Sequence, residues 1–262
     1  MKSAIRWISA AALCVTSLAF KPQAFAAELT LPRDGWVSWQ VAAVEGAPDL
    51  CCFTSSNNLR NAPRTACRID GKEQSWGNRD DATTDQVRVY ARTAAGKLDR
   101  FRVLSATCPA QAATPIRDLG SVTEDDSARW LVDLAKQKND VLAALAVNRG
   151  NVARDALADF ARNDSRGETR KEAVFWLAQV RGQEGADIIS SVMFNDKDPD
   201  VREHAVFALS QLPDERATRA LIAAAEDRSL ARELRKKAVF WLSQSESDAA
   251  QKYLERVLTA NH

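Results

Sequence analysis

The sequence predicts an α+β protein of more than one domain: a small, β-rich, disulfide-containing N-terminal domain followed by an all-α solenoid. Three observations lead to this prediction. A ten-residue segment occurs three times in the C-terminal half, four of the five cysteines lie between residues 51 and 108, and apolar residues in the N-terminal half alternate with a period of two. A segment that recurs about every 33 residues is typical of stacked helical repeats and not of a closed globule.

The N-terminal residues have the pattern of a secretory signal peptide. Lys2 and Arg6 form a basic start, residues 8–20 are mostly apolar, and an A-x-A cleavage site ends at Ala26. The apolar run is shorter than the stretch of about 20 residues that a membrane-spanning helix needs. We therefore expect cleavage near Ala26, no transmembrane segment, and a periplasmic or secreted location.

The length of the chain suggests its division into domains, and its net charge argues against one class of partner. After a signal peptide of residues 1–26, we place the domains at residues 27–118 and 119–262. The whole chain has 36 Lys and Arg against 35 Asp and Glu, and removal of the signal peptide leaves 33 against 35, a net charge of −2. Nucleic-acid binding rests on clustered cations facing phosphates, so this balance predicts no nucleic-acid partner.

The mature chain keeps four cysteines, Cys51, Cys52, Cys67 and Cys108. Four cysteines in an oxidising compartment indicate two disulfides. A bond between the adjacent Cys51 and Cys52 would close a strained eight-membered ring. We therefore expect each of them to pair with Cys67 or Cys108, and the sequence leaves open which with which. The alternative is a four-cysteine zinc site, but the spacing lacks the paired C-x2-C pattern of such sites. We expect no metal and no cofactor.

Residues 27–118 have the pattern of strands and loops. Residues 36–41 combine aromatic and β-branched side chains in an extended pattern, and residues 86–92 alternate between apolar and polar or aromatic positions. Residues 93–97 are a predicted turn, and residues 99–104 are the returning strand of a hairpin. So few apolar positions build only a modest core, which explains why disulfides are needed.

Residues 119–262 have the pattern of paired helices. Thr123, or an aspartate just after it, is a predicted N-cap. The first pair of helices matches the repeats only loosely, as the terminal unit of a solenoid often does. The repeats proper begin at Asn151, and in each of them a first helix precedes a second helix that carries the repeated segment. A last helix is predicted at residues 247–258. The predicted first helices are residues 151–162, 185–194 and 215–226.

The repeated segment has a recognisable pattern. It begins at Arg170, Arg202 and Arg235, and its first and third copies share the letters A-V-F-W-L-x-Q. From Asp196 the middle copy is D-x-D-P-x-V-R-x-x-A-x-x-A-L, in which Asp198 is a predicted N-cap. These residues resemble the short bacterial type of HEAT-like repeat. The resemblance covers about 140 residues and implies a right-handed α-solenoid that binds proteins. More weakly, the N-terminal half resembles the cysteine-containing region that precedes such repeats in some exported bacterial proteins.

A helical wheel assigns the faces of the second helices. With Ala173 at 0°, Leu177 falls at about 40°, whereas Phe175 falls at about 200°, away from the buried arc. If the second helices line the concave side, the same offsets predict a row of aromatic and amide side chains there. The alternative is that the phenylalanines are core residues packed between neighbouring repeats. The predicted protein-binding residues are Phe175, Gln179, His204, Phe207, Gln211, Lys237, Phe240 and Gln244.

An arginine recurs near the start of each second helix, at Arg170, Arg202 and Arg235. A cation at this end opposes the helix dipole, so something must offset its cost. Aspartates of the adjacent loops are the obvious partners, and we predict a structural Arg–Asp ladder along the stack.

These patterns predict a non-enzymatic periplasmic adaptor or scaffold that binds an unidentified protein through the concave face of the solenoid. One alternative is an enzyme or enzyme subunit whose site lies in predicted long loops at residues 54–85, with Asp80, Asp81 and Asp85 as candidate acids. Another is the sensor arm of an envelope signalling system. A deep pocket that unites two of these acids would favour the enzyme, and a shallow apolar groove along the repeats would favour the adaptor.

Overall fold

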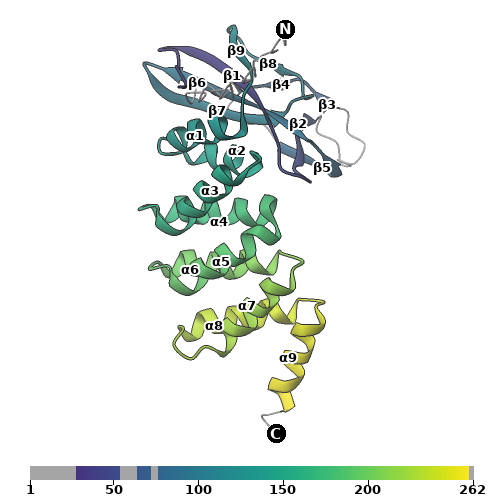
Figure 1. Ribbon diagram of the computed structural model, residues 1–262. Helices are drawn as coiled ribbons and strands as arrows, with labels where there is room; N and C mark the ends of the chain where they lie inside the picture. Colours follow the sequence, from purple (N-terminus) through teal and green to yellow (C-terminus); the bar gives the residue numbers. More distant parts are fainter. Residues whose placement is uncertain (1–27, 54–63, 72–75, 260–262) are drawn as a thin grey trace, which may run out of the picture.

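The computed structural model describes residues 28–53, 64–71 and 76–259 (Figure 1). Strands form one end of the molecule, and paired helices extend from them in a stack that ends at α9 (Asp248–Thr259). A strand-rich part with disulfides is therefore followed by a helical part, and the predicted fold class is confirmed. The predicted signal peptide, residues 1–26, lies outside the described residues.

A four-stranded sheet lies next to the first helices. Its strands are β1 (Gly35–Ala42), β6 (Gln86–Ala94), β7 (Lys97–Ser105) and β9 (Ile116–Ser121). The order is β7-β6-β1-β9, with β1 antiparallel to β6 and parallel to β9. Strands β6 and β7 form the predicted hairpin, and its two turn residues, Ala95 and Gly96, have φ angles of 51° and 77°. Two positive φ angles match the right-handed twist of the strands that such a turn connects.

Two smaller sheets complete the N-terminal part. One has the order β3-β2-β5, and the other pairs β4 with β8 in parallel. The prediction of long loops throughout residues 54–85 is wrong for the described residues of that range, because three strands lie in it. Strand β5 has a polar sequence with little apolar alternation, and its backbone pairing with β2 overrides that weak local preference. The bounds are β2 (Pro48–Phe53), β3 (Arg64–Thr65), β4 (Cys67–Arg68), β5 (Trp76–Thr83) and β8 (Ala110–Gln111).

Two disulfides hold these sheets together. Cys51 is bonded to Cys108 and Cys52 to Cys67, with Cα–Cα distances of 5.5 and 5.3 Å. The prediction that disulfides form, and that the adjacent cysteines do not bond each other, is confirmed. The sulfurs lie in a small apolar cluster of their own, which also contains Trp36, Ile69, Tyr90 and Leu104. The disulfides therefore stabilise the face of the four-stranded sheet that is turned away from the helices.

The helices follow in antiparallel pairs, and side-chain N-caps form at the two helix starts for which the sequence predicts one. The Oγ1 atom of Thr123 accepts a hydrogen bond from the Asp126 amide at 3.1 Å, and Asp198 caps a helix whose first residue is Pro199. No helix in the described part of the chain is long and apolar enough to cross a membrane. The bounds are α1 (Glu124–Ala135), the 3-10 helix η2 (Asn139–Val141), α2 (Leu142–Val147), α3 (Asn151–Asn163), α4 (Gly167–Arg181), α5 (Gln183–Asn195), α6 (Pro199–Ser210), α7 (Glu215–Glu226) and α8 (Arg232–Ser243).

The stack has two rows of helices. The first helices of the repeats, α3, α5 and α7, form one row, and the second helices, α4, α6 and α8, form the other. Contacts between successive second helices are more extensive than those between successive first helices. The row of α4, α6 and α8 is therefore the more closely packed of the two, and we call it the inner row.

One hydrophobic core runs through the four-stranded sheet and the helices, from Val37 to Tyr253. At their junction the ring of Trp39 meets that of Trp130 edge to face at 5.5 Å, and its Nε1 atom donates a hydrogen bond to Ser127 Oγ at 3.0 Å. Backbone hydrogen bonds also cross the junction, such as the one from Val44 N to the Val147 carbonyl at 2.9 Å. The sheet thus covers the apolar end of the solenoid.

Of the three arginines of the predicted Arg–Asp ladder, Arg170 forms an ion pair with an aspartate of an adjacent loop. Arg170 donates to both carboxylate oxygens of Asp196, at 2.7 and 2.9 Å, and to the Asp164 carbonyl at 2.8 Å. Both side chains of the ion pair are buried. Arg202 instead donates to the Met193 carbonyl, at 3.0 Å. Hydrogen bonds from Ser229 lower the pKa of the Asp227 carboxyl. The charges of Arg235 and Arg202 lower this pKa further.

Removing the Asp196 charge should destabilise the fold and weaken its pH dependence. Burial acts to raise the pKa of Asp196, but hydrogen bonds from Arg170 and from the Asp198 amide outweigh it and hold the pKa below the ordinary value. A carboxyl with a lowered folded pKa stabilises the fold above its unfolded pKa of about 3.9, and this contribution is lost as the pH falls through the folded pKa.

We expect Asp196→Asn to cost about 3–5 kcal/mol at pH 7, because Arg170 is then left buried without its charge partner. Below about pH 4 the wild type should lose stability more steeply than the variant. Urea unfolding at pH 7 and pH 3 measures both effects. Asp187→Asn is the control, since Asp187 meets Arg216 on the surface and its loss should cost under about 1 kcal/mol. Equal losses for the two variants would contradict the structural role of the buried pair.

Candidate protein-binding groove

A row of exposed phenylalanines follows the inner row of helices, one on each second helix. Phe175, Phe207 and Phe240 are 37%, 39% and 55% exposed, respectively. The leucine two residues after each of them is buried. The structure therefore places the phenylalanines on the open face that the wheel predicts, and not in the core between repeats.

Tryptophans form the floor beside this row. Trp176 and Trp241 are half-buried, and each meets the phenylalanine that precedes it, with ring centroids 5.1 Å apart. The middle copy has the small Ala208 at this position, so Phe207 has no tryptophan beside it on its own helix. Its ring instead meets Trp241 of the next helix, at 5.3 Å. This contact joins the aromatic side chains of α6 and α8 into one surface.

The aromatic side chains of α6 and α8 line an open groove of about 520 Å³. Four of the eight predicted binding residues contribute to it: His204, Phe207, Lys237 and Phe240. Sequence reasoning missed four others, which are Lys171, Asp200, Glu203 and Trp241. The wheel contained a signal for three of them, because Lys171, Asp200 and Glu203 lie within about 40° of the phenylalanine on their own helix. Trp241 lies at the edge of the buried arc and gave no such signal.

The other predicted residues lie outside this groove. Phe175 and Gln179 lie on α4, on the exposed side of that helix. Gln211 and Gln244 each donate a hydrogen bond to the serine that precedes them, at 3.0 and 3.2 Å. These two glutamines line a separate cavity of about 580 Å³ at the C-terminal ends of α6 and α8. The predicted ladder of amides is therefore separate from the groove.

The charges of the groove are balanced within its own walls. Its lining carries two cations, Lys171 and Lys237, and two acids, Asp200 and Glu203. Lys237 forms an ion pair with Glu203 across the two helices. Burial lowers the pKa of the His204 imidazole and the charge of Lys171 lowers it further, so this side chain is neutral at pH 7. The groove thus presents an apolar floor with little net charge.

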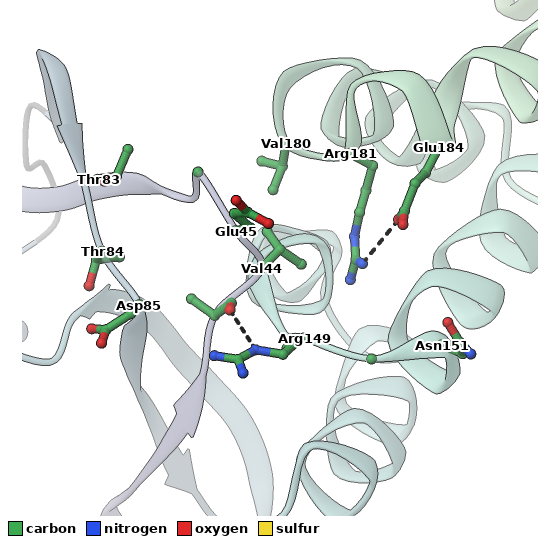
Figure 2. Close-up of a pocket in the computed structure, with 13 residues that line it drawn as sticks. Val44, Glu45, Thr83, Thr84, Asp85, Arg149, Asn151, Val180, Arg181 and Glu184 are labelled. Atoms are coloured by element: carbon green, nitrogen blue, oxygen red, sulfur yellow. Dashed lines mark hydrogen bonds and ion pairs between the residues drawn. The ribbon is translucent and has the colours of Figure 1, made fainter.

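A larger cavity of about 860 Å³ lies where the strands meet the helices (Figure 2). Arg149 donates to the Ala43 carbonyl at 3.0 Å, and the buried Arg181 donates to the Asn148 carbonyl at 2.5 Å. Burial lowers the pKa of Arg181, and the nearby Glu184 opposes this effect. Both guanidinium groups hold backbone carbonyls at the junction of the two parts. Their arrangement explains how the junction is fixed.

The acids of the alternative enzyme site are only partly placed. Asp85 lines the junction cavity, near Thr83 and Thr84. The side chains of Asp80 and Asp81 lie outside the described part of the structure. The junction cavity is lined by Asp85 together with acids of other segments, Glu45 and Glu184.

Stability measurements should separate the exposed phenylalanines from the buried leucines. Substituting any one of Phe175, Phe207 and Phe240 by Ala should cost about 1 kcal/mol or less, the range of surface changes. The matched controls are Ala variants of Leu177, Leu209 and Leu242, which should cost about 2–5 kcal/mol because they leave cavities in the core. Urea unfolding of the six variants decides the matter. Equal losses in the two sets would place the phenylalanines in the core.

Residues 154–243 match the family model of HEAT repeats. No curated protein matches the chain. The matched range runs from within α3 to the end of α8 and includes the first two copies of the repeated segment and all but the last residue of the third. Residues 154–243 are therefore a region of HEAT-like repeats, within a helical solenoid that follows a strand-rich, disulfide-containing N-terminal part.

Proposed function

We propose that this protein is a non-enzymatic scaffold that binds a segment of another protein in the groove between α6 and α8. The observation that carries the proposal is the row of exposed phenylalanines on the inner helices, beside leucines that are fully buried. HEAT repeats are commonly protein-interaction scaffolds, which supports this function. Exposed aromatic rings in contact with one another are also typical of surfaces that become buried on binding.

The chemistry of the groove favours an uncharged, apolar segment as its partner. Burying the rings of Phe207 and Phe240 removes apolar surface from water, and aromatic side chains are frequent hot spots of binding energy. A charged partner would meet cations and acids that are already balanced, so it would gain little there. The ion pair between Lys237 and Glu203 forms a polar rim, which contributes more to orientation than to affinity.

We place the mature protein in the periplasm or outside the cell. Two disulfides are bonded in the structure, and such bonds persist in oxidising compartments. The basic and apolar N-terminal sequence with its A-x-A site supports the same location. Within that compartment the scaffold is either an adaptor or the arm of a signalling assembly, and both functions use the same groove.

Binding should depend on the two phenylalanines of the groove and not on exposed apolar residues elsewhere. We expect the double variant Phe207→Ala/Phe240→Ala to lose at least about tenfold in affinity for a partner captured from envelope extract, as loss of hot-spot rings does. The control is Leu258→Ala on α9, since Leu258 is 69% exposed but lies outside the groove. Titration calorimetry with the purified partner measures both. Unchanged affinity of the folded double variant would exclude the groove as the binding site.

A further inference from the structure

The sulfur atoms of the two disulfides lie in contact with each other. The Sγ atoms of Cys67 and Cys108 are 3.7 Å apart, although each is bonded to a different cysteine of β2. The Sγ atom of Cys51 belongs to the same group, and these three sulfurs lie within 4.8 Å of one another. This sulfur cluster therefore brings together the Sγ atoms of Cys67 and Cys108, which are in contact but not bonded to each other in the structure.

Backbone hydrogen bonds hold Cys67 and Cys108 side by side without help from either disulfide. The amide of Cys67 donates to the Pro109 carbonyl at 2.8 Å, and the amide of Ile69 donates to the Gln111 carbonyl at 2.9 Å. These bonds pair β4 with β8 in parallel, directly after Cys108. Cys67 is fully buried and Cys108 nearly so. Their proximity is therefore a property of the fold and not only of the bonds to β2.

We propose that the four cysteines form one exchange unit, in which reduction of the Cys51–Cys108 bond leads to a new bond between Cys67 and Cys108. A dithiol reductant attacks Sγ of Cys51 and releases Cys108 as a thiolate. The second thiol of the reductant then closes its own disulfide and frees Cys51. The two electrons come from this reductant, which is oxidised to its disulfide.

The exchange step needs no further electrons. The Cys108 thiolate attacks Sγ of Cys67, so the Cys67–Cys108 bond forms and the Cys52–Cys67 bond breaks. Cys52 leaves as a thiolate and takes up a proton. One disulfide and two free cysteines exist before and after this step. The attack starts from atoms that are already 3.7 Å apart.

The exchange would remove both disulfide links between β2 and the rest of the N-terminal part. In the oxidised protein β2 carries one cysteine of each disulfide, and after the exchange it carries none. One reductive event would then remove both disulfide links of β2. If the two disulfides were independent, two reductive events would be needed. The turn before β2 lines the junction cavity at Glu45 and Gly46, so the redox state would act on the segment whose Val44 amide is hydrogen-bonded to the end of α2.

Partial reduction followed by trapping tests the proposal on the full mature chain. The protein is treated with about one equivalent of dithiothreitol, the free thiols are alkylated in acid, and the bonds are mapped by mass spectrometry after non-reducing digestion. We expect the main species with two alkylated cysteines to carry them at Cys51 and Cys52, with Cys67 bonded to Cys108. If every such species retains the Cys51–Cys108 or Cys52–Cys67 bond, the proposal is overturned.

A pair of variants tests the same pairing without a reductant. In Cys51→Ser/Cys52→Ser the remaining cysteines should oxidise to a Cys67–Cys108 disulfide in air, and two free thiols in the folded protein would contradict the proposal. The single variant Cys51→Ser perturbs the sheet less. It should show both Cys52–Cys67 and Cys67–Cys108 bonds, whereas Cys108 free in every molecule would also overturn the exchange. Far-UV circular dichroism confirms that each variant is folded.

Discussion

A helix pair of a solenoid cannot bury its apolar stripe by itself, and this constraint accounts for most of the structure. Each pair is completed by the next one, so the core becomes continuous and its two ends need covers. At one end the four-stranded sheet provides the cover: Trp39 packs against Trp130, and β1 is hydrogen-bonded to the loop after α2. At the other end α9 covers α7 and α8. The four-stranded sheet is therefore part of the solenoid's core and more than a neighbouring domain, because the hydrophobic cluster that contains Val37 also contains Tyr253.

The same constraint produces the candidate binding surface. Because each repeat must present the same buried face to its neighbours, positions that point away from that face also recur in register. Phe175, Phe207 and Phe240 occupy such a position. The repeats are not identical, and their differences shape the groove. Where α6 has Ala208 in place of a tryptophan, the ring of Phe207 reaches Trp241 of α8, and the two helices share one aromatic surface.

The periodic features of this protein could be predicted from the sequence, and the features that depend on distant pairing could not. The wheel directed the phenylalanines away from the buried arc but left open whether they pack between repeats, and only the structure shows them exposed. The alternation of residues 86–92 predicted β6, and elimination of the Cys51–Cys52 bond left two pairings from which only the fold could choose. Strand β5 was missed because its polar sequence becomes a strand only beside β2. Half of the predicted binding residues line the groove, since a wheel describes one helix, whereas the groove is lined by residues of α4, α6 and α8.

The central claim is that the four-stranded sheet and the helices share one core, and Trp39→Ala tests it most directly. Trp39 is fully buried at the junction, far from the helices in sequence, and its truncation should cost about 3–5 kcal/mol. The measurement is urea unfolding followed at 222 nm, where the signal comes mainly from the helices. A shared core predicts that the midpoint of this helical transition falls in the variant by an amount that corresponds to that loss. A helical transition with an unchanged midpoint would show that the solenoid is stable without its cover and would contradict the account.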